Sequence, residues 1–250
     1  MFNYIKGEIY RLLNKKSMYI FFGIFAAVYI LFALVNSRMG DGYNSKSIID
    51  HAYELFMFLP VVLGGYLFGS LYNDDLTSKN LTTLVGYGLS KLKIVLSKLV
   101  LITLFSAVVF GLIPLVMTAV FAILGAAPTA AALGTVYIKA FVALLTTVAF
   151  SALTGIVVYG LQRKTFAMVL YVLLSFGIIS QLISMLLNSD IIRGIAPNLD
   201  KHLMTGITDR IEQGLTSGQP VILIFIEYII YVAVALTLSV LAFHKKELEF

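Results

Sequence analysis

Cysteine is absent from this chain of 250 residues, and charged residues are scarce, at 12% of the sequence. Without cysteine the chain cannot contain a disulfide framework, a thiolate metal site or a cysteine nucleophile. Soluble domains usually contain about 25% charged residues, so this sequence has too little polar surface to cover a water-soluble globule. A soluble enzyme is therefore excluded, and lipid is the solvent that suits the remaining surface.

Metal-ligand clusters and nucleotide-binding motifs are also missing. The three histidines, His51, His202 and His244, lie far apart without ligand spacing, so we expect interfacial or solvated side chains and no metal site. No G-x-x-x-x-G-K-[ST] motif is present, so we expect no ATP hydrolysis and no cofactor in this chain. The net charge of +5 indicates membrane orientation rather than nucleic-acid binding in a chain this apolar.

Hydrophobic residues make up 60% of the chain and occur in long runs. A helix needs roughly 20 mostly apolar residues to cross a hydrocarbon core about 30 Å thick. We therefore predict an all-α, polytopic membrane protein, formed by one transmembrane domain over residues 1–250, with six transmembrane helices. The predicted spans cover residues 18–35, 55–71, 99–124, 136–160, 166–187 and 221–243.

The polar segments outside these spans show two further patterns. Residues 1–16 combine apolar residues at helical intervals with four basic residues, which is typical of an amphipathic helix on the inner membrane surface. A secretory signal is the alternative, but the apolar run that follows is longer than a signal sequence contains, and more spans come after it. Residues 188–220 form the longest polar segment, for which we expect short interfacial or re-entrant helices outside the cell.

The distribution of lysine and arginine predicts the orientation of the spans. With both termini in the cytoplasm, 12 of the 18 basic residues lie on the inner side. Basic residues favour the cytoplasmic side of membrane proteins, so we predict a multi-pass protein of the cell membrane with both termini cytoplasmic. The inner residues are Lys6, Arg11, Lys15, Lys16, Lys79, Lys91, Lys93, Lys98, Arg163, Lys164, Lys245 and Lys246.

The predicted inner loop between the second and third spans is the most informative stretch. Asp74 and Asp75 can cap a short helix that follows them, because carboxylates accept bonds from its first N–H groups. Leu84 lies on the apolar side of that helix, and Gly88 can end it because glycine permits a sharp backbone reversal. Ser90 can then cap the next helix. The loop is either an ordinary basic loop with a surface helix or a docking helix that a cytosolic partner moves.

This loop, residues 72–98, resembles that of the permease subunits of ABC-2 type exporters. The pattern is a span, an acidic cluster, a short helix, a Gly-x-Ser-basic turn and a further lysine. In this sequence it comprises Asp74, Asp75, Lys79, Leu84, Gly88, Ser90, Lys91 and Lys98. The amphipathic N-terminal segment, the six predicted spans and the short basic tail are similar too. As a small, lysine-rich chain without cysteine, it resembles the permeases of the lantibiotic-immunity, bacitracin-type and phenol-soluble-modulin exporters of Gram-positive bacteria.

The resemblance implies a division of labour between chains. Two permease subunits, identical or related, would form the translocation path through membrane lipid. Two copies of a separate ATPase subunit would bind ATP and Mg and would move the loop helix through the coupling residues named above. The implied activity is export of amphipathic, antimicrobial or toxin peptides. Alternatives are an exporter of hydrophobic drugs or lipids, and an assembly or sensor protein that transports nothing.

Polar residues inside the spans indicate where a translocation path can lie, because ionisable groups in hydrocarbon are costly. Glu227 in the last span can line a path for a cationic peptide or pair with Lys139, and Gln181 is a third candidate for the path. The alternative is that Glu227 and Lys139 only reach the outer interface by snorkelling.

Two other classes of membrane protein lack support in the sequence. An intramembrane enzyme would need facing catalytic groups, and a secondary transporter usually shows repeats or broken helices with central charges. The sequence shows neither.

Overall fold

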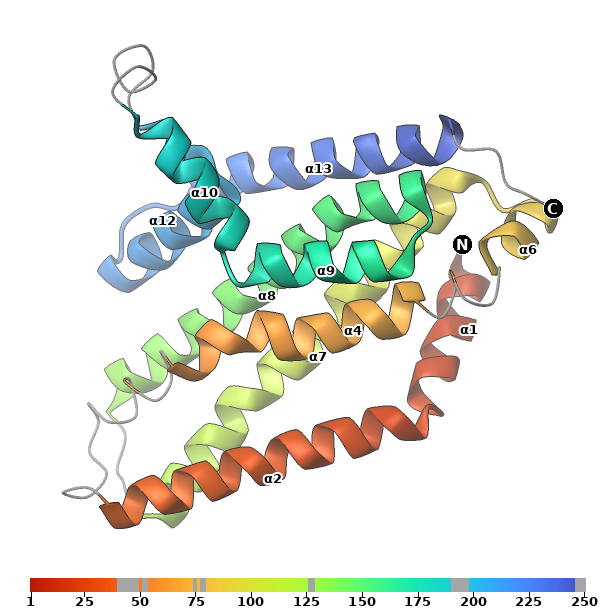
Figure 1. The fold of residues 1–250 in the computed structure, drawn as a ribbon. Helices are drawn as coiled ribbons and strands as arrows, with labels where there is room; N and C mark the ends of the chain where they lie inside the picture. Colours follow the sequence, from red (N-terminus) through yellow and green to blue (C-terminus); the bar gives the residue numbers. More distant parts are fainter. Residues whose placement is uncertain are drawn as a thin grey trace.

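The computed structural model describes residues 1–39, 50, 54–73, 76, 80–125, 129–189 and 198–245, and within these residues the regular elements are helices (Figure 1). The elements are α1 (Phe2–Leu13), α2 (Lys16–Met39), a helix over Glu54–Tyr72 with η1 (Pro60–Gly64), α4 (Gly65–Phe68) and η2 (Gly69–Asn73), then α6 (Asn80–Gly86), α7 (Lys91–Ile123), α8 (Ala130–Leu161), α9 (Lys164–Ser175), α10 (Ile178–Leu187), η3 (Leu199–His202), α12 (Met204–Ser217) and α13 (Ile222–Lys245). The turns η1 and η2 are π-helical.

Four described helices are long and apolar enough to cross a membrane: Glu54–Tyr72, Lys91–Ile123, Ala130–Leu161 and Ile222–Lys245. The bent pair α9 and α10 makes a fifth if the two helices count as one span. The prediction of an all-α, polytopic membrane protein is therefore confirmed. The first predicted span, 18–35, falls within α2, whose described apolar part is the shorter stretch Lys16–Leu31. The total of six spans thus remains a prediction.

The predicted span 166–187 is not one straight helix. Helices α9 and α10 meet at a 62° bend, and Gly177 between them has a φ of +73°. Glycine adopts this left-handed backbone readily, whereas a residue with a side chain is strained there. Gly177 therefore allows α10 to leave the direction of α9, and several α10 residues then line a cavity with α12.

Helix α8 is the centre of the bundle, because α7, α9, α12 and α13 all pack against it. Ala143, Thr147 and Ser151 lie at four-residue intervals on α8 and are buried. Gly155 continues the same row, and a Cβ atom there would lie 3.1 Å from the Ser239 hydroxyl on α13. Small side chains let membrane helices approach closely, so this stripe serves helix packing.

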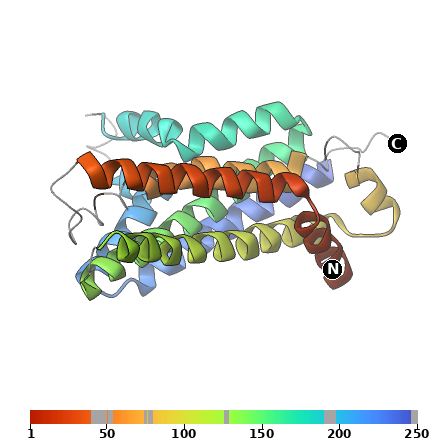
Figure 2. The ribbon, with the colours of Figure 1, turned by 90° about the horizontal axis from the view of Figure 1, so that it is seen from below.

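The N-terminal residues form the separate helix α1, which turns away from α2 (Figures 1 and 2). Leu12 is buried against the bundle, whereas Phe2 and Tyr10 are 85% and 72% exposed. Exposed apolar and aromatic residues on a basic amphipathic helix are typical of a helix that lies at a membrane interface.

Different elements gather at the two ends of the bundle. Helices α1 and α6 and the last turn of α13 lie at one end, whereas α12 and the end of α10 lie at the other (Figures 1 and 2). Helix α12 forms much of the polar segment 188–220, for which the sequence predicts short helices; residues 190–197 fall outside the described residues. The arrangement separates the α6 end from the α12 end.

Candidate functional site

Helix α6 occupies the position of the predicted loop helix. Leu81 is buried at its start, and Leu84 is partly buried against the main hydrophobic core. These two leucines give α6 an apolar side that packs onto the bundle. The other predicted coupling residues before it, Asp74, Asp75 and Lys79, lie outside the described residues.

The turn after α6 is built by a glycine and a serine. The N–H groups of Gly88 and Leu89 donate to carbonyls of the last turn of α6 at 2.9 and 3.1 Å, and Gly88 has a φ of +81°. Ser90 then caps α7, since its hydroxyl accepts a bond from the Lys93 N–H at 3.4 Å. This combination ends one helix and starts the next within three residues. Gly88 and Ser90 therefore have the local roles that their spacing predicts.

Lys91 is engaged within the chain. Its Nζ donates to the Phe243 carbonyl at 2.7 Å and lies 5.1 Å from the centre of the Phe243 ring. The contact fastens the start of α7 to the last turn of α13, where cations stabilise the carbonyl end of a helix. Tyr87, between α6 and Ser90, is in contrast 83% exposed. Tyr87 is therefore more accessible to a partner than Lys91. It was not among the residues predicted from the sequence.

A buried ion cluster joins α1 to both flanks of the α6 segment. Lys98 is completely buried, and its Nζ donates to Glu8 Oε2 at 2.9 Å and to the Leu71 carbonyl at 3.0 Å. Arg11 Nη2 donates to the same Glu8 oxygen at 2.8 Å and to the Ser70 carbonyl at 3.4 Å. Ser70 and Leu71 precede α6 and Lys98 lies in α7 after it, so the cluster joins α1 to the chain on both sides of α6.

The charge state of this cluster follows from the balance of burial and pairing. Burial by itself raises the pKa of Glu8, but the charges and hydrogen bonds of Lys98 and Arg11 outweigh burial and hold that pKa below its usual range. Glu8 is therefore ionised at neutral pH and balances the charge of Lys98. In the sequence the only signal was that Glu8 is the single acidic residue among residues 1–16.

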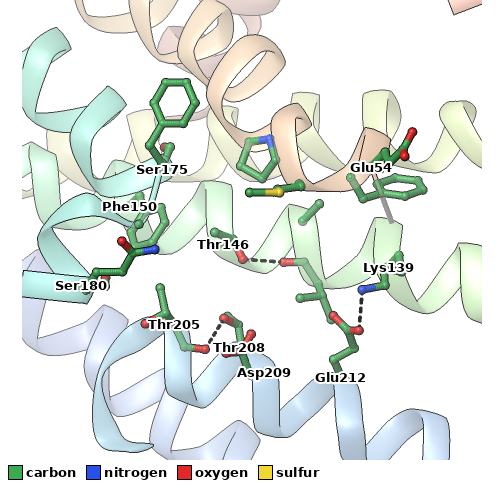
Figure 3. A pocket seen from close by; sticks show the side chains of 18 of the residues that line it. Glu54, Lys139, Thr146, Phe150, Ser175, Ser180, Thr205, Thr208, Asp209 and Glu212 are labelled. Carbon is green, nitrogen blue, oxygen red and sulfur yellow. Dashed lines mark hydrogen bonds and ion pairs between the residues drawn. The ribbon is translucent and has the colours of Figure 1, made fainter. Parts of the chain in front are cut away.

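A cavity of about 720 Å³ lies between the Glu54–Tyr72 helix, α8, the α9–α10 bend and α12 (Figure 3). Aromatic and apolar side chains form part of its wall: Phe56, Met57, Pro60, Val142, Phe150 and Phe176. Hydroxyl and amide groups form another part: Thr146, Ser175, Ser180, Gln181, Thr205 and Thr208. This mixed lining suits a molecule that is itself partly apolar and partly polar.

Charged residues in this cavity are predominantly acidic. Its described lining includes the carboxylates Glu54, Asp209 and Glu212, together with Lys139. Lys139 Nζ lies 2.6 Å from Glu212 Oε1, so these two charges offset each other (Figure 3). Burial, and secondarily the neighbouring Glu212 carboxylate, raise the pKa of Asp209 above its usual range, against the opposing effect of Lys139. Glu54 and Asp209 leave the cavity with a net negative charge when ionised.

Two of the three predicted path residues line this cavity, and one does not. Lys139 and Gln181 contribute to its wall, whereas Glu227 lines a separate pocket with His202. The predicted pairing of Glu227 with Lys139 is wrong. Glu227 Oε1 lies 2.6 Å from His202 Nδ1, and Glu227 Oε2 accepts a bond from Arg210 Nη2 at 2.6 Å. Helix α12 places Arg210 beside Glu227 of α13 and Glu212 beside Lys139 of α8. Glu227 and Lys139 therefore each pair with α12.

Metal binding has no support among the described residues. In that part of the chain, no group of three or more histidine or acidic side chains is arranged to hold an ion.

The helical bundle, with its cavity bounded by apolar spans, defines a polytopic α-helical membrane protein. The sequence profile described as "ABC-2 family transporter protein" matches residues 4–181, more than two thirds of the chain. The chain therefore belongs to the ABC-2 family and is the membrane-embedded permease subunit of an ABC transporter, which works with an ATPase subunit. A comparison with curated proteins found no match.

Proposed function

We propose that this permease exports amphipathic, cationic peptides from the cell or its membrane. Two copies of the chain, or this chain and a related permease, form the path, and two ATPase subunits that bind ATP and Mg drive it. In this arrangement both termini and α6 face the cytoplasm, and α12 faces the outside of the cell membrane. The observation that carries the proposal is the cavity, whose aromatic wall and net acidic charge complement both sides of such a peptide.

The cavity supports a peptide more strongly than a neutral drug or lipid. Phe176 and Met57, which are 46% and 68% exposed, offer apolar area for the hydrophobic side of an amphipathic helix. Glu54 and Asp209 offer carboxylates for lysine or arginine side chains. A neutral hydrophobic compound would leave those carboxylates desolvated without a partner, which costs free energy.

Removing the two carboxylates is expected to weaken peptide binding. In a Glu54→Gln/Asp209→Asn variant, we expect the Kd of a labelled cationic amphipathic peptide to rise about tenfold, equivalent to about 1.4 kcal/mol. Fluorescence anisotropy of the purified permease in lipid nanodiscs measures it. Glu227→Gln is the matched control, since it removes a carboxylate outside the cavity, and its Kd should not change.

The same measurement tests the substrate class through pH. Asp209 binds a cation only when ionised, and its raised pKa means that it becomes protonated at a higher pH than an ordinary carboxyl group. Affinity should therefore fall as the pH is lowered through this raised pKa, and Asp209→Asn should flatten that part of the profile. Equal binding by a neutral hydrophobic compound, with no effect of either substitution, would favour the drug or lipid exporter instead.

The α6 segment is the proposed contact for the ATPase. Helix α6 packs one side on the bundle, and Tyr87 after it is exposed. Helix α7, which begins at Lys91 directly after this segment, contacts α13 through Lys91 and α1 through Lys98. A push on this segment is therefore passed to two other helices. The predicted coupling roles of Asp74, Asp75, Lys79, Leu84, Gly88, Ser90 and Lys91 form part of this proposal.

Loss of the exposed tyrosine is expected to weaken assembly with the ATPase. Tyrosine is a frequent hot-spot residue in protein interfaces, so we expect Tyr87→Ala to reduce recovery of the co-expressed ATPase in a pull-down about tenfold. Leu84→Asp should reduce it as well, but Leu84 also packs on the core. Tyr137→Ala is the control, because it removes a different exposed tyrosine, which lies on α8. Equal recovery with Tyr87→Ala and Tyr137→Ala would show that the ATPase docks elsewhere.

A further inference from the structure

A second hollow, distinct from the cavity above, runs between α2 and α7. It has a volume of about 440 Å³, and the described residues that line it are almost entirely apolar. Residues Phe22, Phe25 and Ala26 of α2 face Phe105, Val109 and Ile113 of α7 across it. We refer to it as the α2–α7 groove. No segment of the described chain fills this groove.

The α2–α7 groove has the length of one membrane leaflet. Its lining runs from Met18 to Tyr29 along α2 and from Phe105 to Val116 along α7. At a rise of 1.5 Å per residue, each stretch measures about 16 Å. This is about half of a hydrocarbon core roughly 30 Å thick. An acyl chain of a phospholipid in one leaflet would fit along it.

One end of the α2–α7 groove reaches the bend between α1 and α2. Leu13 and Tyr19 line that end, and the Tyr19 hydroxyl donates to the Leu13 carbonyl at 2.6 Å, which holds the bend in place. Lys15 and Lys16 lie in this bend, between the end of α1 and the start of α2. The apolar lining therefore ends close in the chain to Lys16, the exposed first residue of α2.

We propose that the α2–α7 groove binds an anionic phospholipid of the leaflet that contacts α1. One acyl chain lies between α2 and α7, and the headgroup phosphate is bound by the exposed Lys16. An apolar channel with a cationic end is complementary to such a lipid, and each lysine near an anionic membrane surface contributes about a fivefold gain in affinity. The bound lipid would hold the α1–α2 bend against α7. The proposal depends on the membrane location of the chain and not on the substrate of the transporter.

The absence of tryptophan from the chain makes the proposal directly testable by fluorescence. Phe25→Trp places a reporter in the groove wall, and Ile24→Trp places one on the neighbouring residue, which is 60% exposed. Each variant is reconstituted in vesicles that contain equal fractions of brominated phosphatidylglycerol or brominated phosphatidylcholine, because bromine quenches tryptophan fluorescence on contact. We expect the anionic lipid to show about fivefold or greater relative affinity at position 25, and no preference at position 24.

Charge-removal variants identify the source of the preference. Lys16→Gln should abolish the preference for phosphatidylglycerol at position 25. Arg163→Gln, which removes a basic residue elsewhere, should leave it unchanged. Phe22→Trp is a second groove reporter if Phe25→Trp does not fold.

Two results would overturn the proposal. Equal quenching by both lipids at positions 25 and 24 would show that the groove holds ordinary membrane lipid without selection. Absence of quenching by either lipid at position 25, with normal quenching at position 24, would show that a second copy or another protein covers the groove.

Discussion

Replacing Glu8 by alanine is expected to lower the free energy of unfolding by about 3–5 kcal/mol, because it removes the carboxylate that pairs with the buried charge of Lys98. Lys98 is completely buried, and the Leu71 carbonyl at 3.0 Å and the Tyr4 ring at 5.5 Å offset its charge less than a carboxylate does. Arg11 also loses its carboxylate partner. Reversible unfolding of the purified permease in mixed micelles, monitored by circular dichroism, measures the effect.

A double substitution separates stability from coupling in this cluster. Glu8→Leu/Lys98→Met removes both charges and keeps apolar volume, so we expect it to recover most of the lost stability, as replaced buried ion pairs often do. The Glu8–Lys98 ion pair between α1 and α7 is nevertheless absent in this variant. In a complex that contains this permease variant, peptide should therefore stimulate the ATPase subunit less than in the unmodified complex. Equal destabilisation by Glu8→Ala and by the double variant would refute the buried-charge explanation.

Replacing Gly64 by alanine is the second change with a large expected effect. A Cβ atom at residue 64 would overlap the Tyr171 hydroxyl and lie 2.9 Å from Thr147 Cγ2. The Tyr171 hydroxyl donates to the Pro60 carbonyl at 2.9 Å, so the new methyl group would displace a buried hydrogen bond. Overpacking costs about 1–3 kcal/mol and a lost buried hydrogen bond about 1–3 kcal/mol more. We expect a loss of about 2–6 kcal/mol in the same unfolding measurement.

Gly65→Ala provides the matched control for Gly64→Ala. The nearest atom to a Cβ at residue 65 is Met168 Cε at 3.5 Å, which is an ordinary contact. Alanine also has the higher helix propensity, by about 1 kcal/mol, so we expect Gly65→Ala to be neutral or slightly stabilising. If both variants unfold alike, then the close approach of α9 to the Glu54–Tyr72 helix does not limit stability. Gly64→Ala should also perturb peptide binding, because Pro60 lines the cavity.

Local features of the α6 segment were predictable because they depend on neighbouring residues. Gly88 and Ser90 end and begin helices through bonds that span three to five residues, and such bonds follow from residue type and spacing. The bend at Gly177 was missed because the apolar run continues through it. A glycine inside an apolar run is compatible with a straight span and with a break.

Partners across the bundle were not predictable from the sequence. Pairing of Lys139 with Glu227 was one of the alternatives that the sequence left open, but Lys139 pairs with Glu212 and Glu227 pairs with Arg210, both from α12. Lys98 resembled a residue at the membrane boundary, but the structure buries it against Glu8, 90 positions earlier in the chain. A side chain's position in the sequence does not reveal which distant helix packs beside it.

The sequence by itself determined that this protein lies in a membrane and that its spans are helical. Scarce charge and long apolar runs require a membrane, and in lipid a backbone must satisfy its hydrogen bonds internally, which favours helices. Only the tertiary structure decided where the acidic cavity, the Glu8–Lys98 cluster and the α2–α7 groove lie. These sites are formed by side chains from helices that are distant in sequence, and helix packing depends on the shapes of all contacting surfaces.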